Sequence, residues 1–291
     1  MATLEYVPLL REQRSIYDHP LGMERFRTYL ELMTQGTGDM VLPLAGLNPM
    51  GKPHVAQALD ALLAIDADTI AADAMREAED RLGPWPTAVL VGGPDRDEPG
   101  AEPSTSLRVA LVLLDERGGW SNRPLDEVNA LRGSVAPLLK RRWLPAYHQA
   151  TDDHLPDRVR ADVLAEVYRF RALTTFGPPA NLRGMMVLHG LAQTFAGAIA
   201  PCLDSDELEY TWQVIAPFLD ADAQGDFPTI VACLQGDDAA RIAGYSPLGL
   251  SARAGLALAL SRARTSGFPP ERVFQSHDGP RQAESAWMRS E

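Results

Sequence analysis

Residues 107–115, LRVALVLLD, give the strongest strand signal in the chain, because apolar and β-branched side chains follow one another almost without interruption. A second apolar run, TAVLVGG at residues 87–93, precedes it, and a polar, Pro- and Gly-rich segment lies between the two. We expect these runs to be neighbouring strands of one sheet. DMVLPLAGL at residues 39–47 also has strand character.

Helical patterns surround these strands in the first half of the chain. Residues 1–35 are predicted to form an N-terminal arm and a helix, since apolar side chains recur at helical spacing in MERFRTYLELM. An Ala- and Leu-rich pattern of the same period covers residues 54–82. The order of strand, loop and helix predicts a small sheet with flanking helices.

The second half of the chain has almost no strand signal. Glycine- and proline-rich turns divide it into apolar segments that predict helices. We therefore expect an α+β fold with a single domain at 1–291: an α/β part at 1–150, a helical part at 151–268 and a flexible polar tail at 269–291. The predicted helices are 157–175, 180–200, 205–218, 227–243 and 249–265.

Composition limits the classes of partner and location. The chain has 291 residues, 45% of them hydrophobic, which is enough for a sizeable core, and a formal net charge of −12. Such a charge repels nucleic acid and anionic membranes, so neither is an expected partner. No apolar run approaches the roughly 20 residues of a membrane span, and the N-terminus lacks the pattern of a signal peptide. We expect a cytoplasmic protein.

Residues 147–171, YHQATDDHLPDRVRADVLAEVYRFR, are the densest source of proton-transfer groups. His148 and Asp152 are four residues apart and would share one face of a helix, with Asp153 and His154 close by. A carboxylate beside a histidine orients the ring and stabilises its protonated form. We therefore predict that His148, Asp152, Asp153 and His154 are catalytic, although a solvated acidic turn that caps the next helix explains much of the same charge.

The same segment permits a divalent-metal alternative. His148 and His154 could bind a metal together with Glu166 and possibly His189, but the spacing H-x3-D-D-H is not a specific metal motif. The two cysteines of the chain have no CxxC or CxxH spacing. The leading expectation is an enzyme without a cofactor.

Two loops are candidate substrate-binding segments. NPMGKPH at residues 48–54 connects a predicted strand to a predicted helix, so Asn48, Lys52 and backbone N–H groups could hold an anion, although an ordinary turn explains the loop as well. GGWSNR at residues 118–123 follows the strongest strand and contributes Trp120, Asn122 and an anion-clamping Arg123, or else only a turn that buries the tryptophan.

A third candidate is His189, which lies in an apolar segment rich in small residues, LRGMMVLHGLAQTFAGAIA. A lone histidine in such a segment is more often a hydrogen-bonded core residue than a ligand. We include it among the candidate substrate-binding residues.

The segments NPMGKPH, GGWSNR and GDDAARIAGYSPLGLSARAG together resemble a family of uncharacterised bacterial proteins, and this resemblance implies no activity. The order of the helix ending in AEDRL, the strands TAVLVGG and VALVLLD, and HGLAQTFA also resembles the layout of zincin-like peptidases. That family carries HExxH followed by EGLAE. Here HExxH is missing and His189 replaces the glutamate, so the resemblance implies a degenerate zincin-like fold.

These observations favour a metal-independent enzyme that acts on a small anionic metabolite by general-base chemistry. The base would be His148 with Asp152 or Asp153, and Lys52 and Arg123 would hold an anionic group that leaves during elimination or intramolecular ring closure. The alternatives are a metal-dependent hydrolase on a zincin-like scaffold and a non-catalytic partner subunit of a homo- or hetero-oligomer.

Overall fold

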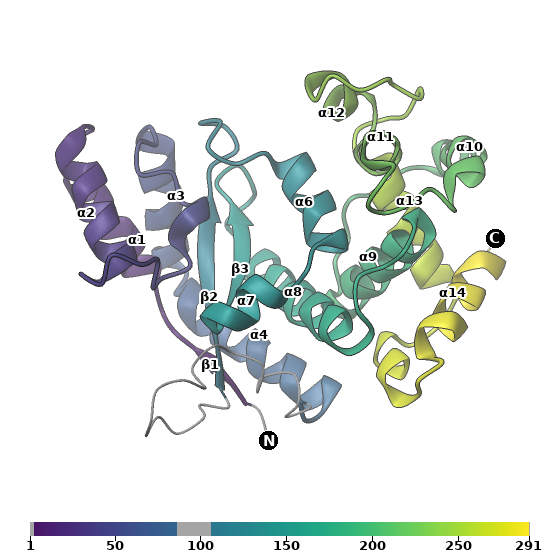
Figure 1. The fold of residues 1–291 in the computed structure, drawn as a ribbon, viewed down its shortest axis with the longest axis horizontal. Coiled ribbons are helices and arrows are strands. Elements are labelled where there is room, and N and C mark those ends of the chain that lie inside the picture. The colour runs from purple at the N-terminus through teal and green to yellow at the C-terminus, as the bar shows by residue number, and fades with distance from the viewer. Residues whose placement is uncertain (1–2, 86–105, 291) are drawn as a thin grey trace. The chain divides into compact units, whose positions relative to one another are not determined.

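Within residues 3–85 and 106–290, a three-stranded parallel sheet contains the predicted strand 107–115 as its central strand β2, Ser106–Leu114. β1, Thr3–Tyr6, pairs with one edge of β2, and β3, Trp143–Gln149, pairs with the other (Figure 1). Every side chain from Val109 to Leu114 is buried, as expected for a parallel strand that is covered on both faces. With its small sheet and many helices, the protein has the predicted α+β fold.

The computed structural model describes residues 3–85 and 106–290. The chain divides into two units, each of which is described by itself. Unit 1 holds the sheet, and within its described residues unit 2 is helical. Unit 1 consists of Met1–Asn122 and Val135–Phe170, and unit 2 consists of Arg123–Ser134 and Arg171–Glu291.

The register of the sheet decides which side chains gather at its carboxyl edge. Leu113 of β2 pairs with His148 of β3, and Leu114 pairs with Gln149. Both strands are parallel, so the residues that follow them, beginning with Asp115, emerge at the same edge. Ligand sites of α/β proteins lie outside the carboxyl ends of such strands.

Helices of unit 1 cover the sheet and carry the loops at its edge. α1 packs against β2 and α3, while α4 packs against β1 and β2. The long helix predicted at 54–82 is two helices, because the chain turns at Asp66, whose φ of 55° is left-handed. The elements are α1 (Leu10–Ser15), η1 (Ile16–Asp18), α2 (Met23–Thr34), α3 (Pro53–Ala64), α4 (Ala67–Leu82), α7 (Ala136–Arg141) and α8 (Pro156–Phe176), whose last turns belong to unit 2.

Two strand predictions for the first half need comment. The strand predicted at 39–47 is wrong: the segment contains only the short helix η2, Leu44–Gly46. Pro43 has no N–H to donate to a ladder, and Leu42 and Leu47 are buried by loop packing instead. The strand predicted at 87–93 lies outside the described residues. β1 pairs with β2, and no prediction included β1.

Unit 2 is built from helices that approach one another closely. α9 and α13 pack together where a Cβ on Gly190 would lie 2.3 Å from the Ala259 carbonyl oxygen. The predicted helix 227–243 is interrupted at Gly236, which has a φ of 80°. The helices are α6 (Arg123–Arg132), α9 (Leu182–Ala196), α10 (Ser205–Ile215), η4 (Ala216–Phe218), α11 (Phe227–Gln235), α12 (Asp237–Ile242) and α13 (Ala254–Thr265).

The stretch predicted as a flexible tail at 269–291 instead contains η5 (Pro270–Gln275) and α14 (Gly279–Arg289). Gly279, Ala283 and Trp287 are four residues apart and form the buried stripe of α14. The stripe is easily missed in the sequence because polar residues surround its few apolar members. A single large side chain, Trp287, supplies most of its buried surface.

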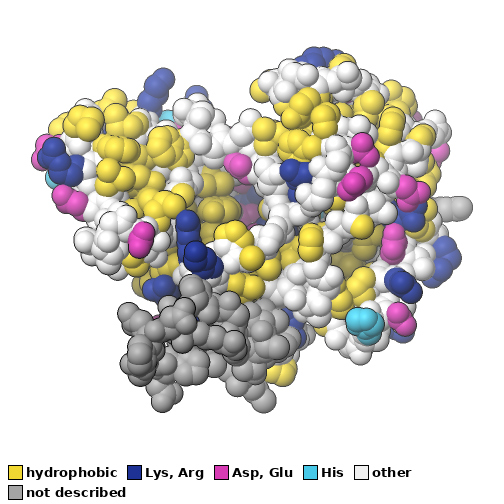
Figure 2. Space-filling model, in the orientation of Figure 1, with side chains coloured by type: hydrophobic (Ala, Val, Ile, Leu, Met, Phe, Trp, Pro, Cys, Tyr) yellow, Lys and Arg dark blue, Asp and Glu magenta, His cyan; other side chains and the backbone are white. Residues whose placement is uncertain are grey.

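Figure 2 shows that acidic and basic side chains are interspersed on the visible face of each unit, so the negative charge is not gathered into one patch on this face. Within residues 3–85 and 106–290, no helix has the length and apolar character that crossing a membrane requires.

Candidate functional site

Asp115, the first residue after β2, is the centre of a hydrogen-bonded cluster in unit 1. Its side chain is completely buried. His54 Nε2 lies 2.8 Å from Oδ1, the Gly118 backbone N–H donates to the same oxygen at 2.8 Å, and Asn48 Nδ2 donates to Oδ2 at 2.8 Å. Three partners from two segments, residues 48–54 and 118–123, therefore fix the carboxylate in one orientation.

These contacts keep Asp115 ionised. Burial by itself would raise the pKa of the carboxyl group, but the hydrogen bonds from His54, Asn48 and Gly118, together with attraction to His54, lower the pKa below its ordinary value. The result is a buried negative charge with a histidine beside it. Such a carboxylate stabilises the imidazolium form of the ring when the ring accepts a proton.

His54 is presented by the start of α3, where Pro53 occupies the first turn. Because the ionised Asp115 accepts a hydrogen bond, Nε2 of His54 carries the hydrogen and Nδ1 is the basic nitrogen. Nδ1 has no hydrogen-bond partner among the described residues, and 19% of the side-chain surface of His54 is exposed to solvent. The arrangement is that of a general base with an orienting carboxylate.

Hydrogen bonds from helices α2 and η1 and from its own backbone hold the loop that carries Asn48. Tyr17 donates its hydroxyl hydrogen to the Asn48 carbonyl, and Arg25 Nη1 donates to the Gly51 carbonyl at 3.2 Å. The N–H groups of Met50 and Gly51 donate to Asn48 itself, at 3.0 Å each. These two N–H groups therefore stabilise the loop itself.

Gly118 is required by the close packing around Asp115. A Cβ at this position would lie 2.1 Å from Asp115 Oδ2 and 2.6 Å from Asn48 Nδ2. Neither atom can retreat without breaking a hydrogen bond of the cluster. The first glycine of GGWSNR thus lets the backbone approach the carboxylate.

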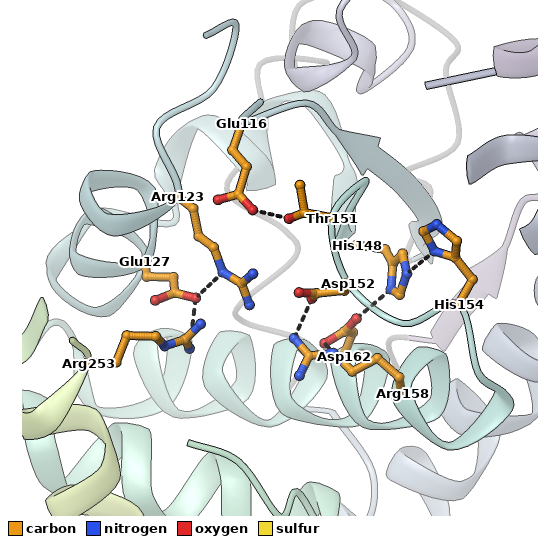
Figure 3. A network of polar contacts seen from close by, with 10 residues as sticks. All are labelled: Glu116, Arg123, Glu127, His148, Thr151, Asp152, His154, Arg158, Asp162 and Arg253. Atoms are coloured by element: carbon orange, nitrogen blue, oxygen red, sulfur yellow. Dashed lines mark hydrogen bonds and ion pairs between the residues drawn. The ribbon is translucent and has the colours of Figure 1, made fainter. Parts of the chain in front are cut away.

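His148, the predicted base, belongs to a second histidine system in unit 1. Its Nδ1 lies 2.8 Å from Asp162 Oδ2, and its Nε2 lies 3.0 Å from His154 Nδ1, so the ring stands between these two partners (Figure 3). The predicted pairing with Asp152 on a helix is wrong, because His148 is in strand β3. Asp152 instead accepts a hydrogen bond from Arg158 at 2.7 Å.

The second system forms a chain from carboxylate to surface. When Asp162 accepts from Nδ1 of His148, Nε2 accepts from His154 Nδ1, which leaves His154 Nε2 as the outer basic nitrogen. Burial and repulsion from His148 lower the pKa of His154 against the attraction of Asp152 and Asp153. His154 is half-buried and Asp153 is exposed.

The other candidates of unit 1 differ in their exposure to solvent. Lys52 immediately precedes α3, two positions before His54, and its side chain is exposed. Trp120 is 43% exposed and donates its indole N–H to the Ala45 carbonyl at 2.9 Å, so the turn does not bury it. Asn122 is exposed. Asn48 is the candidate that directly contacts Asp115.

Arg123 and His189 belong to unit 2. Arg123 begins α6 and pairs with Glu127 at 3.1 Å, and Glu127 also pairs with Arg253 at 3.0 Å (Figure 3). Burial would raise the pKa of Glu127, but the two arginines and a hydrogen bond from Gln235 lower it. His189 is buried on α9. The predicted anion clamp therefore forms an ion pair within its own unit.

The proposed alternative metal ligands are not gathered. Glu166 pairs with Arg169, and His148 and His154 contact each other through their ring nitrogens. Among residues 3–85 and 106–290, no group of three or more His, Cys, Asp and Glu side chains has the arrangement of a metal site.

Sequence reasoning missed His54 and Asp115 as functional residues. Two signals were present: Asp115 is an acidic residue that ends the strongest strand, and His54 follows Pro53 at the start of a helix. Comparisons with protein-family models, curated proteins and solved structures give no match to this chain. The resemblances to a bacterial family and to a zincin-like layout stay predictions.

Proposed function

We propose that this protein is an enzyme that acts on a small anionic metabolite by general-base catalysis, with His54 as the base. The observation that supports the proposal is the pairing of His54 with the buried, ionised Asp115 at the carboxyl end of β2. A buried carboxylate with three fixed partners is more than helix capping or solubility requires.

In the proposed step, Nδ1 of His54 removes a proton from the substrate and Asp115 stabilises the imidazolium that forms. Lys52, exposed two residues before His54, attracts the anionic group of the substrate. The reaction class is elimination, or an intramolecular displacement in which a heteroatom closes a ring and an anionic group leaves. General-base catalysis of this kind contributes about 10²–10⁴-fold to a rate.

The test uses a His54→Gln variant and a pool of anionic metabolites, with each reaction followed by mass spectrometry. We expect the wild-type protein to consume at least one metabolite and to release an anion or a cyclised product, while His54→Gln is about 10²–10⁴-fold slower. His19→Gln is the matched control, because the side chain of His19 is at the surface, where Nδ1 lies 3.5 Å from an exposed glutamate, Glu24.

Three results would count against the proposal. One is a His54→Gln variant that turns over at the wild-type rate. Another is an equal loss in His19→Gln, which would indicate a general surface effect. The third is an activity that a chelator abolishes and that added Zn²⁺ or Mn²⁺ restores, since it would favour the metal-dependent hydrolase.

A further inference from the structure

Unit 2 contains a groove of about 500 Å³ that the proposed function does not use. It lies between the turn that follows α13, the short helix η5 and one face of α14. Its volume falls within the range of small-molecule sites.

The groove is lined by three arginines and by no acidic residue. Arg272, Arg281 and Arg289 are exposed, and none of their side chains makes an ion pair or hydrogen bond with a described residue. Most other described arginines do pair with a carboxylate or a carbonyl group. The acidic residue on α14, Glu284, faces Arg183 at 3.6 Å and does not line the groove.

The helix period explains how the charges come to face the groove. Arg281, Ser285 and Arg289 are four residues apart and form one stripe of α14, opposite the buried stripe that contains Trp287. The two arginines are separated by two turns, about 12 Å along the axis. Lys and Arg side chains lie at the surface where α14 runs in Figures 1 and 2.

The remaining lining residues suit the organic part of a ligand as well as its charge. Arg272 lies over the ring of Phe268, with its guanidinium carbon 5.9 Å from the ring centroid, which fixes one of the three cations. Gln282 and Ser285 add neutral hydrogen-bond donors, and Pro269 and Ala286 add apolar surface. Guanidinium groups bind phosphate oxygens in a bidentate manner.

We propose that this groove binds a small molecule through two linked phosphate groups. Three like charges repel one another when no anion is present, and one diphosphate group offers oxygens to all three guanidinium groups. A net charge of −12 opposes a long polyanion such as nucleic acid, which would extend beyond the groove. The site lies in unit 2 and does not depend on the proposed function of His54.

The experiment is calorimetric titration of the full chain with inorganic pyrophosphate, with inorganic phosphate and sulfate for comparison. We expect pyrophosphate to bind more tightly than either single anion, and added NaCl to weaken binding. Each of Arg272→Gln, Arg281→Gln and Arg289→Gln is expected to weaken binding about tenfold, and the triple variant to abolish it. The substitutions are at exposed positions, and circular dichroism checks that the variants fold.

Arg241→Gln is the matched control, since Arg241 is an exposed arginine of unit 2 that already pairs with Asp237 and Asp238. Its affinity for pyrophosphate should equal that of the wild type. The proposal is overturned by no measurable binding of pyrophosphate, by unchanged binding in the triple variant, or by an equal loss in Arg241→Gln. Binding of an oligonucleotide without binding of pyrophosphate would also overturn it.

Discussion

His54 and His148 stand beside carboxylates in the same unit, yet their surroundings differ. His54 pairs with Asp115 and keeps one ring nitrogen without a partner among the described residues. His148 is fully buried, and both of its nitrogens are engaged, one by Asp162 and one by His154. A histidine whose nitrogens are both occupied connects elements of the fold, whereas one with a single anchored nitrogen has the other available for chemistry.

The two pairs also show that closeness in the sequence does not identify the carboxylate that a histidine contacts. The density of ionisable groups at 147–171 points to His148, whose carboxylate partner is 14 residues away. The carboxylate partner of His54 is 61 residues away. A high density of ionisable residues therefore identifies a polar segment. The fold decides which histidine keeps a ring nitrogen without a hydrogen-bond partner.

The largest effect is expected from Asp115→Asn. The amide no longer stabilises the imidazolium and can turn an N–H toward His54, so turnover of the substrate should fall by about 10²–10⁴-fold. Steady-state kinetics at several pH values would measure the loss. Asp162→Asn tests the comparison, because it makes the same change beside His148; an equal loss there would remove the functional distinction between the two histidines.

His148→Ala should act on stability instead. Removal of the ring leaves a cavity and deprives Asp162 and His154 of their partner, which we expect to cost about 2–4 kcal/mol. Urea denaturation followed by circular dichroism measures the change, with the 38% exposed His19→Ala as the control. The folded fraction should retain its rate. A stable His148→Ala variant without activity would instead return His148 to the catalytic role that the sequence predicted.

Gly118→Ala should test how much the position of the Asp115 carboxylate matters for turnover, because the substitution leaves its charge unchanged. The new methyl group displaces Asp115 and Asn48, with an expected cost of about 1–3 kcal/mol and about a tenfold loss of turnover. Gly119→Ala is the neighbouring control: its φ of 69° strains an alanine, but nothing lies within 4 Å of the new Cβ. Comparable turnover losses in both variants would show that backbone strain, not displacement of Asp115, is responsible.

The smallest expected effect is a pH dependence of stability. The pKa of Asp115 is lower in the folded protein than in an unfolded chain, so its contribution to stability is present above the unfolded pKa. The contribution is lost as the pH falls through the folded value. Thermal melts between neutral and acidic pH should show a smaller decline in Asp115→Asn than in the wild type. Equal declines would argue against an ionised, stabilising Asp115.

The features that the sequence predicted well are those with local causes. The strand at 107–115 and the helix at 157–175 follow from continuous apolar runs and helical spacing, which neighbouring residues set. β1 is only four residues long and is stable because it pairs with β2. Nothing within such a short segment distinguishes it from a loop.

The candidate site was less predictable because its contacts are long-range. Asn48 was identified from its loop, but its role depends on a hydrogen bond to Asp115, 67 residues away. The spacing of His148 and Asp152 was interpreted on a helix, and strand geometry sends the two side chains to different partners. Arg123 was predicted to bind substrate because it follows a glycine-rich loop. In the structure, it makes an ion pair with Glu127.

The path of the chain between the two units has a consequence for protein synthesis. α6 belongs to unit 2, although its sequence interrupts unit 1, and its buried residues Val128 and Leu131 are covered by packing against α9 and α11. About 95 residues separate the end of α6 from the start of α11. At translation rates of about 5–20 residues per second, α11 is synthesised roughly 5–20 s after α6. Until α11 is synthesised, the apolar face of α6 therefore lacks one of the two helices that cover it in the folded unit.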